Sequence, residues 1–469
     1  MLRLRCRIKI KHKGEIPMSI VNDTSFSFNK QFKFNFNGGE LSSDGGLFLL
    51  KEFVHRIGFE KVIRDNFQTN DSAAFRFHTD DKNLMQRIFQ TLAGYFNDND
   101  ADELTTDPVF CAVLGKDALA SQPTMSRFFN RMDEDSLIQF EKIFRILRQK
   151  IYGIRPPENI LLDLDSTLLQ TYGHQEGEGF NYHYQSHGYH PLLCFDGLTG
   201  DLLKAELRKG TKYCSSDAHL FLESLLNEFL EQYPDTVISL RGDSGFAAPE
   251  IYDLAETHAC RYAIRLKMNS TLKSLAADIE ADLDRLTKDN KVDYAVCHGD
   301  FMYKASSWKY ARRVVCKVEK PTDQMTYMYT FVVTNMDLDP EDIIRFYCNR
   351  GRMENFIKES KNGFDFSCMS SHAMVVNAGR LIICMLAYNL FNWFKRLVLP
   401  KQFQKMQIET FRLKLIKIAA RVIHSSRYRS FRFCSSCPYK DEFREILLNI
   451  QQLQIPERKR LICGVAIPR

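Results

Sequence analysis

The stretch Tyr347–Lys361, which reads YCNRGRMENFIKESK, constrains the fold and function of this chain more than any other. Its polar side chains recur at steps of three, four and seven residues, at Tyr347, Arg350, Glu354 and Lys361. Because an α-helix turns once every 3.6 residues, this spacing predicts one helix that carries all four on one face. A carboxylate beside a phenol and two cations is not a core pattern. It favours a metal-dependent phosphodiester site.

Two aspartates upstream could complete such a site. Asp165 ends one predicted apolar strand, and Asp243 comes just after another. Strand ends and the loops after them often present functional groups. Asp163 is a rival of Asp165, because residues two apart on a strand point to the same face. With Glu354 the aspartates could hold two Mg²⁺ ions, which prefer oxygen ligands. Two metal ions about 3.5–4 Å apart can activate an attacking oxygen and stabilise a leaving one.

The composition is that of an ordinary globular protein. The 469 residues, 44% hydrophobic and 26% charged, predict two to four domains with a large core. We find no apolar run of about 18 residues and expect no membrane contact. The 13 cysteines lack a framework spacing, which favours reduced thiols in the cytoplasm. Cys434 and Cys437 form a lone C-x-x-C pair, whereas a zinc site needs four ligands.

The net charge of +6 is modest but unevenly distributed. Between Lys395 and Arg432 there are eleven Lys or Arg residues and one acidic residue, Glu409. This local excess of positive charge indicates contact with a polyanion such as double-stranded DNA. Lys414 and Lys417 are the candidate DNA-binding residues in it. The alternative is a solvated helix face.

The hydrophobic pattern predicts an α/β protein in six segments. For residues 156–267 the predicted order β-β-β-α-β-α-β indicates a mixed sheet with flanking helices. Asp44 is expected to cap the first helix, and Met18 is an alternative start to Met1. The segments are an extended arm (1–45, of which 1–17 could be non-native), a helical DNA-binding domain (46–155), the first part of a catalytic core (156–267), a β-rich insertion (268–340), the second part of the core with the Glu354 helix (341–399), and a basic helical region for DNA binding or dimerisation (400–469).

Residues 121–127, SQPTMSR, are typical of a capped helix start, with Pro123 in the first turn. Phe128 would then be buried, while Arg127 and Arg131 would stay exposed. A short helix with Ser, Thr and Arg outside suits a DNA groove. A surface helix of a helical bundle explains the pattern equally well.

The combination of motifs is more specific than its parts. The pattern Tyr347-x2-Arg350-x3-Glu354-x6-Lys361 resembles the signature of a large group of bacterial insertion-sequence transposases of the DDE type, at all four positions. Asp165-Ser166-Thr167 resembles their first-aspartate motif, and the segment 242–246 resembles their second. The long β-rich stretch before Glu354 is also similar to this group. The resemblance spans residues 159–395.

This resemblance implies a ribonuclease H-like core with Asp165, Asp243 and Glu354 as ligands of two Mg²⁺ ions, for which Mn²⁺ could substitute. It implies a bacterial, nucleoid-associated DNA transposase. Such an enzyme binds terminal inverted repeats, cleaves the DNA by hydrolysis and joins the 3′-hydroxyl ends to target DNA as a homodimer. Tyr347, Arg350 and Lys361 would contact phosphates beside the cut. A related endonuclease without strand transfer and a non-catalytic DNA-binding relic are the alternatives.

Two further features have competing interpretations. Trp308 could stack on a flipped base, although a packed aromatic side chain on a strand is favoured. Four histidines within 17 residues invite a zinc interpretation, but phosphate contact or surface placement is favoured. These are His174, His183, His187 and His190.

Overall fold

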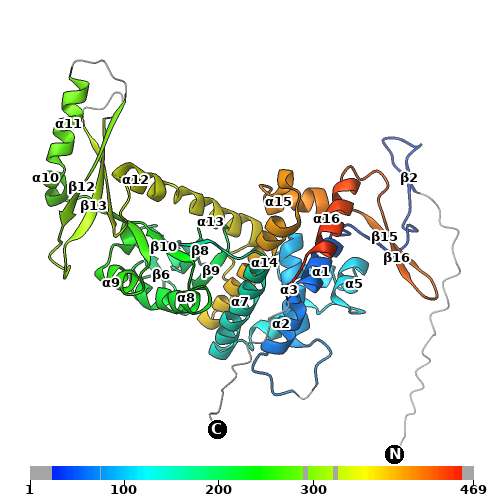
Figure 1. Ribbon diagram of the computed structural model, residues 1–469. Helices are drawn as coiled ribbons and strands as arrows, with labels where there is room; N and C mark the ends of the chain where they lie inside the picture. The colour runs from blue at the N-terminus through cyan, green and yellow to red at the C-terminus, as the bar shows by residue number, and fades with distance from the viewer. Residues whose placement is uncertain (1–23, 74, 289–293, 321–325, 457–469) are drawn as a thin grey trace, which may run out of the picture.

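The structure is a computed structural model that describes residues 24–73, 75–288, 294–320 and 326–456. The choice between Met1 and Met18 lies outside these residues. The molecule is elongated, with a β-rich end, a central sheet and a helical end that contains both N-terminal and C-terminal segments (Figure 1).

One mixed sheet of eight strands runs through the molecule, in the order β12-β13-β14-β11-β10-β4-β8-β9. Strand β10 is parallel to β4 and β11, and the other neighbours are antiparallel. Helix α8 (Ala218–Gln232) connects β9 to β10, and α9 (Pro249–Thr257) connects β10 to β11. The order predicted for residues 156–267 is thus confirmed for the main sheet, and three short strands between β4 and β8 were not predicted. The strands are β4 (Asn159–Ser166), β8 (Leu192–Asp196), β9 (Leu202–Glu206), β10 (Val237–Gly242), β11 (Arg261–Leu266), β12 (Ala295–Tyr303), β13 (Arg312–Lys320) and β14 (Met328–Thr334).

The β-rich segment 268–340 extends this sheet. Strand β14 pairs antiparallel with β11, and β13 and β12 follow outward. Helices α10 (Ser270–Leu275) and α11 (Ala277–Thr287) lie over these strands at one end of the molecule (Figure 1). Trp308 is 5% exposed and packs edge-on against Tyr252 and Tyr303, each 5.3 Å between ring centroids. The favoured interpretation, a packed aromatic, is therefore confirmed.

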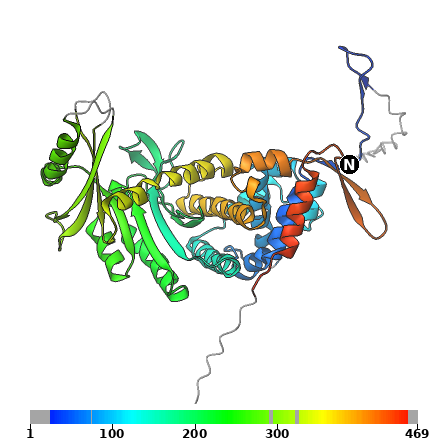
Figure 2. The same cartoon turned by 45° about the horizontal axis from the view of Figure 1, so that its top comes forward.

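The signature stretch forms two helices, and the prediction of one continuous helix was wrong. Helix α12 (Pro340–Cys348) ends before a tight turn, and α13 (Gly351–Phe364) begins after it. In the turn the amides of Arg350 and Met353 donate three residues back, to Tyr347 and Arg350. These tighter bonds interrupt the α-helical ladder. The two helices still run end to end along the molecule (Figure 2).

A helical region precedes the sheet and shares one hydrophobic core with it. Helix α6 begins at Gln122 with Pro123 in its first turn, as the pattern at 121–127 predicted, although Ser121 at the N-cap makes no side-chain capping hydrogen bond. The helices are α1 (Leu47–Arg56), α2 (Phe59–Asn66), α3 (Asp80–Ala93), α4 (Asp100–Glu103), α5 (Pro108–Leu114), α6 (Gln122–Phe129) and α7 (Glu134–Ile154). The first helix begins after Gly46, without the side-chain cap expected from Asp44.

Helix α14 (Met374–Val398) is the central helix of that core. It packs against α3, α6, α7 and β9. By length and composition it could cross a membrane, yet 89% of its apolar window is buried inside the protein. The expectation that no such apolar segment exists was therefore wrong. Burial against other helices accounts for its apolar character.

The C-terminal region is partly β-structure, which corrects the expectation of a helical segment. Strands β15 (Ala420–His424) and β16 (Arg429–Phe433) form a hairpin, and β15 also pairs with β3 (Leu41–Ser42). Alternation of apolar and basic residues suits a strand that is half buried. The remaining elements are β1 (Thr24–Ser25), β2 (Lys33–Phe34), α15 (Ile408–Phe411), a π-helical turn (Arg412–Ile416) and α16 (Lys440–Gln452).

A small three-stranded sheet projects between β4 and β8. It is built from β5 (Leu169–Gln170), β6 (Gly179–Asn181) and β7 (Ser186–Tyr189), in the order β5-β7-β6. We call residues 169–189 the flap. Every cysteine among the described residues is a free thiol.

Candidate active site

Two neighbouring strand ends bring Asp165 and Asp243 together. Asp165 lies near the end of β4, and Asp243 directly follows β10. These strands are parallel, with Arg241 opposite Asp163, so that Asp243 and Asp165 lie at the same level. Arg350 confirms their proximity, because its Nη2 lies 3.1 Å from Oδ2 of Asp165 and 3.8 Å from Oδ2 of Asp243.

Glu354 reaches the same place from helix α13. It lies in the first turn of that helix, and with Asp165 it lines a cavity of about 320 Å³. Tyr184 of the flap and Lys361 line this cavity as well. The Lys361 ammonium donates to Oγ1 of Thr167 at 2.6 Å and to the carbonyl of Leu168 at 3.0 Å.

The site has an excess of negative charge. The pKa of Asp165 is raised to about 6, mainly by burial and also by the nearby Asp243 and Glu354, although Arg350 opposes this rise. Burial also lowers the pKa of Lys361, although Asp165 raises it. Both shifts mean that burial disfavours the ionised forms of Asp165 and Lys361 unless an oppositely charged partner is added to the site. Arg350 lies between the two aspartates and is the nearest compensating cation.

The donor set fits a hard divalent cation. It consists of carboxylate oxygens, the ligands that Mg²⁺ and Mn²⁺ prefer. Within the part of the chain that the structure describes, no three His, Cys, Asp or Glu side chains are grouped closely enough to hold a metal ion. With Arg350 between the aspartates, Glu354 stands at the cavity wall rather than in direct contact with them.

Asp163, the rival of Asp165, has a different partner. Its two oxygens accept from Nε and Nη2 of Arg241 at 2.7 and 2.6 Å, and both side chains are buried. Nη1 of Arg241 also donates to the carbonyl of Phe346 at 2.6 Å. This bidentate pair ties β4, β10 and α12 together and leaves Asp163 no exposed oxygen for a metal.

Comparison with known families identifies the chain. The family described as transposase DDE domain group 1 matches residues 24–455. The chain belongs to this family. It is a DNA transposase.

Comparison with individual proteins adds little. No curated protein sequence is similar to this transposase. Among solved structures, the cryo-EM structure of the piggyBac transposase synaptic complex with hairpin DNA has a TM-score of 0.42 and 13% sequence identity. The match covers 89% of this chain and 86% of that one.

Tyr347 is placed differently from the other signature residues of the transposase. It is 9% exposed and packs in a small core with Ile343 and Ile344 under the sheet. Burial raises the pKa of Tyr347, although Arg350 lowers it. The helix breaks at 349–350, and Tyr347 lies before the break with its ring in this core. The phosphate contact expected of Tyr347 stays a prediction.

The expected DNA-binding residues of helix α6 also separate. Arg127 is exposed, as predicted. Arg131 instead donates to Oδ1 of Asp80 at 2.7 Å and to Oγ1 of Thr69 at 3.0 Å. Asp71 lies 3.5 Å from the same guanidinium. This ion-pair network makes Arg131 a structural residue instead of the exposed cation that the helical pattern predicted.

The two expected lysines of the basic segment are engaged within the protein. Lys417 donates to Oδ1 of Asp44 at 2.6 Å, and its ammonium lies 4.1 Å from the ring centroid of Tyr95. Lys414 lies 5.4 Å from the ring centroid of Tyr439. Lys417 thus has a structural partner in the DNA-free protein, and its contact with DNA stays a prediction. Asp44, the expected helix cap, is its buried partner.

The flap supplies residues that the sequence pattern did not identify. Tyr184 donates to the carbonyl of Ser166 at 3.2 Å, and burial raises the pKa of Tyr184 to about 12. The histidines of this stretch have separate partners. Glu178 lies near both His174 and His187, while the His190 ring faces the carbonyl of Lys212. The repeated aromatic residues at 180–184 were the signal that could have indicated a cavity wall.

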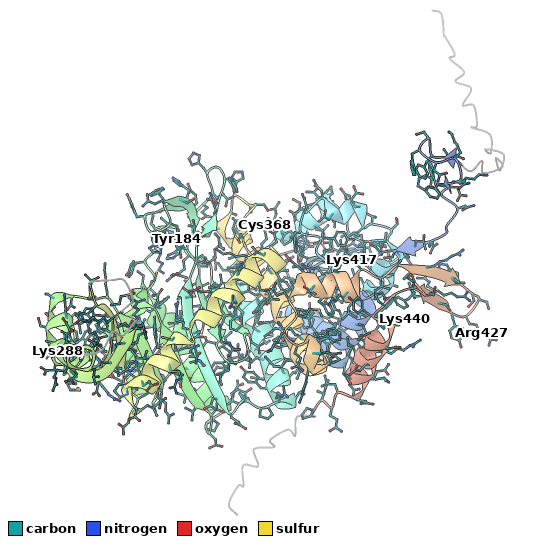
Figure 3. The ribbon with its side chains drawn as sticks, turned by 90° about the horizontal axis from the view of Figure 1, so that it is seen from above. Tyr184, Lys288, Cys368, Lys417, Arg427 and Lys440 are labelled. Carbon is teal, nitrogen blue, oxygen red and sulfur yellow. The ribbon has the colours of Figure 1, made fainter. Side chains whose placement is uncertain are left out.

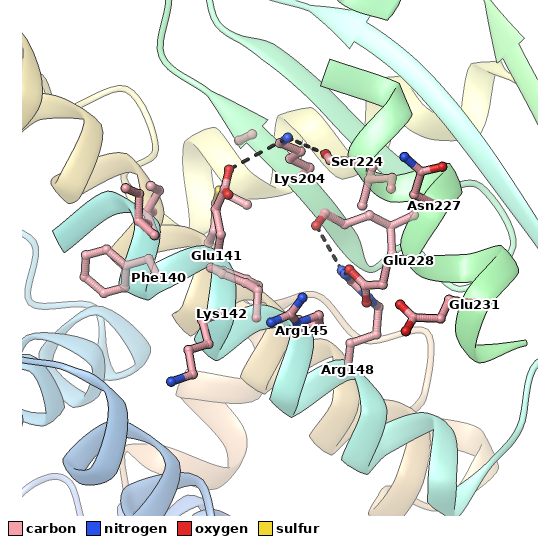
Figure 4. Close-up of a pocket in the computed structure, with 17 residues that line it drawn as sticks. Phe140, Glu141, Lys142, Arg145, Arg148, Lys204, Ser224, Asn227, Glu228 and Glu231 are labelled. Atoms are coloured by element: carbon pink, nitrogen blue, oxygen red, sulfur yellow. Dashed lines mark hydrogen bonds and ion pairs between the residues drawn. The ribbon is translucent and has the colours of Figure 1, made fainter. Parts of the chain in front are cut away.

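A larger cavity, of about 490 Å³, lies away from the carboxylates, between α7, α8 and β9. Figure 4 shows Glu141 pointing toward Lys204 and Glu228 toward Arg148, while Lys142 points away. Arg148 donates to Glu228 at 2.5 and 3.1 Å, and Lys204 donates to Oγ of Ser224 at 2.7 Å. These mutual contacts explain its polar lining without a ligand.

Proposed function

We propose that this transposase has a ribonuclease H-like core and that Asp165, Asp243 and Glu354 are the carboxylates with which it cleaves DNA. The order β9-β8-β4-β10-β11, in which three antiparallel strands are followed by two parallel ones, supports that core. One observation carries the proposal: two strand-end aspartates meet at one guanidinium, beside a cavity that Glu354 also lines.

The three carboxylates would hold two Mg²⁺ ions, and Mn²⁺ would substitute. The oxygen donor set and the raised pKa of Asp165 support a site that needs added positive charge. When bound, the two ions supply activation of the attacking oxygen and stabilisation of the leaving oxygen. For the metal ions to bind, the Arg350 side chain has to move out from between Asp165 and Asp243.

Arg350 and Lys361 would then bind the DNA phosphate beside the cut. Nε of Arg350 is buried and has no hydrogen-bond partner among the described residues, so it can donate to a phosphate oxygen. Lys361 contacts the β4 end through Thr167 and would place a point charge at the same phosphate. Tyr347 holds the α12 end in the core and so positions Arg350.

We infer that the DNA is the terminal inverted repeats of an insertion sequence, and that the 3′-hydroxyl ends are then joined to target DNA. We infer a homodimer as the acting form and the bacterial cytoplasm, at the nucleoid, as its place. Membership of the transposase family supports these inferences.

Substitution of Glu354 tests the proposal. Glu354→Ala removes one carboxylate of the metal set, so Mg²⁺-dependent cleavage of a duplex that carries the element end should fall below detection. Binding of the same duplex should stay within about threefold, because other residues supply most phosphate contacts. Glu341→Ala is the matched control, since Glu341 is exposed on α12 and pairs only with Arg345. Cleavage by Glu354→Ala at the rate of Glu341→Ala would refute the assignment. Cleaved ends that are never joined to a target plasmid would indicate an endonuclease without strand transfer.

A further inference from the structure

The β15–β16 hairpin, residues 420–433, projects from the helical end of the molecule (Figure 1). It carries no acidic residue and four exposed arginines, at Arg421, Arg427, Arg429 and Arg432. None of the ion pairs or side-chain hydrogen bonds in the described part of the chain involves these four. Other cations of the basic segment do have partners, such as Arg396 with Asp201. The positive charge that the sequence places between 395 and 432 is therefore free mainly on this hairpin.

The register of the hairpin sets two arginines directly opposite each other. Arg421 pairs with Arg432, and directly opposed residues of an antiparallel pair point to the same face. Like charges in that position repel and destabilise the sheet. With no carboxylate paired to either one, an anion from outside is the missing partner.

The opposite face of the hairpin is anchored to the body. Phe431 alternates with Arg432 along the strand, and its ring packs edge-on against Phe48 at 4.6 Å between centroids. Phe433 packs with a tilted ring on Phe443 of α16, at 5.3 Å between centroids. The apolar face thus fixes the hairpin, and the arginine face points away from the core.

The base of the hairpin is also tied to the N-terminal segment. Strand β15 pairs with β3, and the amide of Gly45 donates to the carbonyl of Ile418 at 3.0 Å. At Gly46 an added Cβ would lie 1.6 Å from the carbonyl oxygen of Leu415, so only glycine allows this close approach. A ribbon held in this way loses little conformational entropy when it binds a ligand.

We propose that residues 420–433 are a DNA-binding ribbon, in which Arg421 and Arg432 together grip the phosphate backbone of duplex DNA. Arg427, in the turn between the two strands, extends this contact at the tip, whereas Arg429 lies on the face of Phe431. A two-stranded ribbon fits the major groove of DNA, and guanidinium groups bind phosphate bidentately. This inference rests on the proposed function, because it assigns a second contact on the same DNA.

The ribbon contacts duplex distant from the cut. Figure 3 shows Arg427 at the opposite end of the molecule from Lys288, with Tyr184 of the active-site cavity between them. The contact is therefore to uncleaved DNA that continues past the helical end. Because phosphates carry no sequence information, the ribbon binds the element end and unrelated duplex alike.

The test is the double variant Arg421→Ala with Arg432→Ala, in the full chain. Its affinity for duplex DNA, followed by fluorescence anisotropy across a NaCl series, should fall about 10- to 100-fold. The slope of log K against log[NaCl] should become shallower by about two, one for each lost phosphate contact. The melting temperature should stay equal or rise, because the repulsion between the two arginines is gone. A merely structural role would lower it.

The matched control is Lys61→Ala with Arg64→Ala, which removes the same charge from the exposed face of α2. An equal loss of affinity in both double variants would overturn the ribbon, since net charge alone would then explain binding. Unchanged affinity and slope in the Arg421/Arg432 variant would also overturn it. The proposal would also be overturned if the Arg421/Arg432 variant lost binding to phosphatidylserine vesicles but kept its affinity for DNA, because the arginines would then bind a membrane surface.

The same experiment separates the two proposals. If the wild-type protein binds no duplex even at low salt, the proposed function fails. If the wild type binds and cleaves while the Arg421/Arg432 variant behaves identically, only the ribbon fails. At saturating DNA the ribbon variant should keep the Mg²⁺-dependent cleavage rate, since Asp165, Asp243 and Glu354 are untouched.

Discussion

The ionised side chain of Asp165 lowers the stability of the metal-free protein. That side chain is only 15% exposed, and burial raises its pKa to about 6. A carboxyl whose pKa rises on folding binds its proton more tightly in the folded state, so its ionised form destabilises the fold at neutral pH. An active site that awaits a cation is expected to carry such a cost.

Asp165→Asn should therefore raise the melting temperature of the metal-free transposase at pH 7.5 while abolishing cleavage. The gain over wild type should be largest above pH 6. It should shrink as the pH falls from 6 toward 4, because wild-type Asp165 then takes up its proton. Thermal denaturation in EDTA across this pH range measures the difference. Added Mg²⁺ should stabilise the wild type and leave Asp165→Asn unchanged. A variant that melts below wild type at pH 7.5 would contradict this account.

Burial also raises the pKa of Asp163, two residues away, but both of its oxygens accept hydrogen bonds from Arg241. Asp163→Ala would leave the guanidinium of Arg241, which is 2% exposed, without its carboxylate. We expect a loss of about 3–5 kcal/mol in the free energy of unfolding, measured in urea. Asp300→Ala is the control, because it removes the partner of Arg313 from a more exposed pair and should cost little. Equal costs in the two variants would argue against Asp163 as a buried anchor.

At the level of elements, spacing predicted the placement of three of the four signature residues on one helix. Arg350 keeps a helical backbone as the N-cap of α13, so Glu354 and Lys361 follow it at helical intervals. Tyr347 lies before the break, on α12, and its ring is buried. Strand periodicity could not decide whether Asp163 or Asp165 belongs to the site, because residues two apart on a strand point to the same face. The choice depended on Arg241, which only the parallel register of β4 and β10 brings opposite Asp163.

Lys417 belongs to the junction between the N-terminal segment and the hairpin. Its partner Asp44 is 1% exposed and also accepts from the Tyr95 hydroxyl at 2.8 Å. Lys417→Ala should lower the free energy of unfolding by about 3 kcal/mol, because it leaves a buried carboxylate without its cation. Lys414→Ala should change stability little. Urea denaturation of both variants, with DNA affinity corrected for the folded fraction, checks this. Wild-type stability with lost DNA binding in Lys417→Ala would restore it as a DNA contact.

At the scale of the whole molecule, composition and periodicity could not show which segments share a core. The hydrophobic pattern predicted separate segments on either side of residue 156, yet α14 brings residues from both into one cluster. Phe394 of α14 packs edge-on against Phe53 of α1, at 5.4 Å between centroids. At Gly379 an added Cβ would lie 2.5 Å from Sδ of Met132. Such contacts join residues more than 200 positions apart, and no local pattern encodes them.

This shared core predicts that residues 156–469 do not fold alone. Without α1–α7, the apolar face of α14 that includes Phe394 and Leu386 would be exposed to water, at a cost of about 25 cal/mol per Å². Arg380 would also lose Asp98, to which it donates at 2.6 and 3.1 Å. Calorimetry of this fragment should show no cooperative unfolding transition, whereas residues 24–456 should show one. A fragment that melts cooperatively and still cleaves DNA would establish 46–155 as an independent domain, because its helices would then be dispensable for the core.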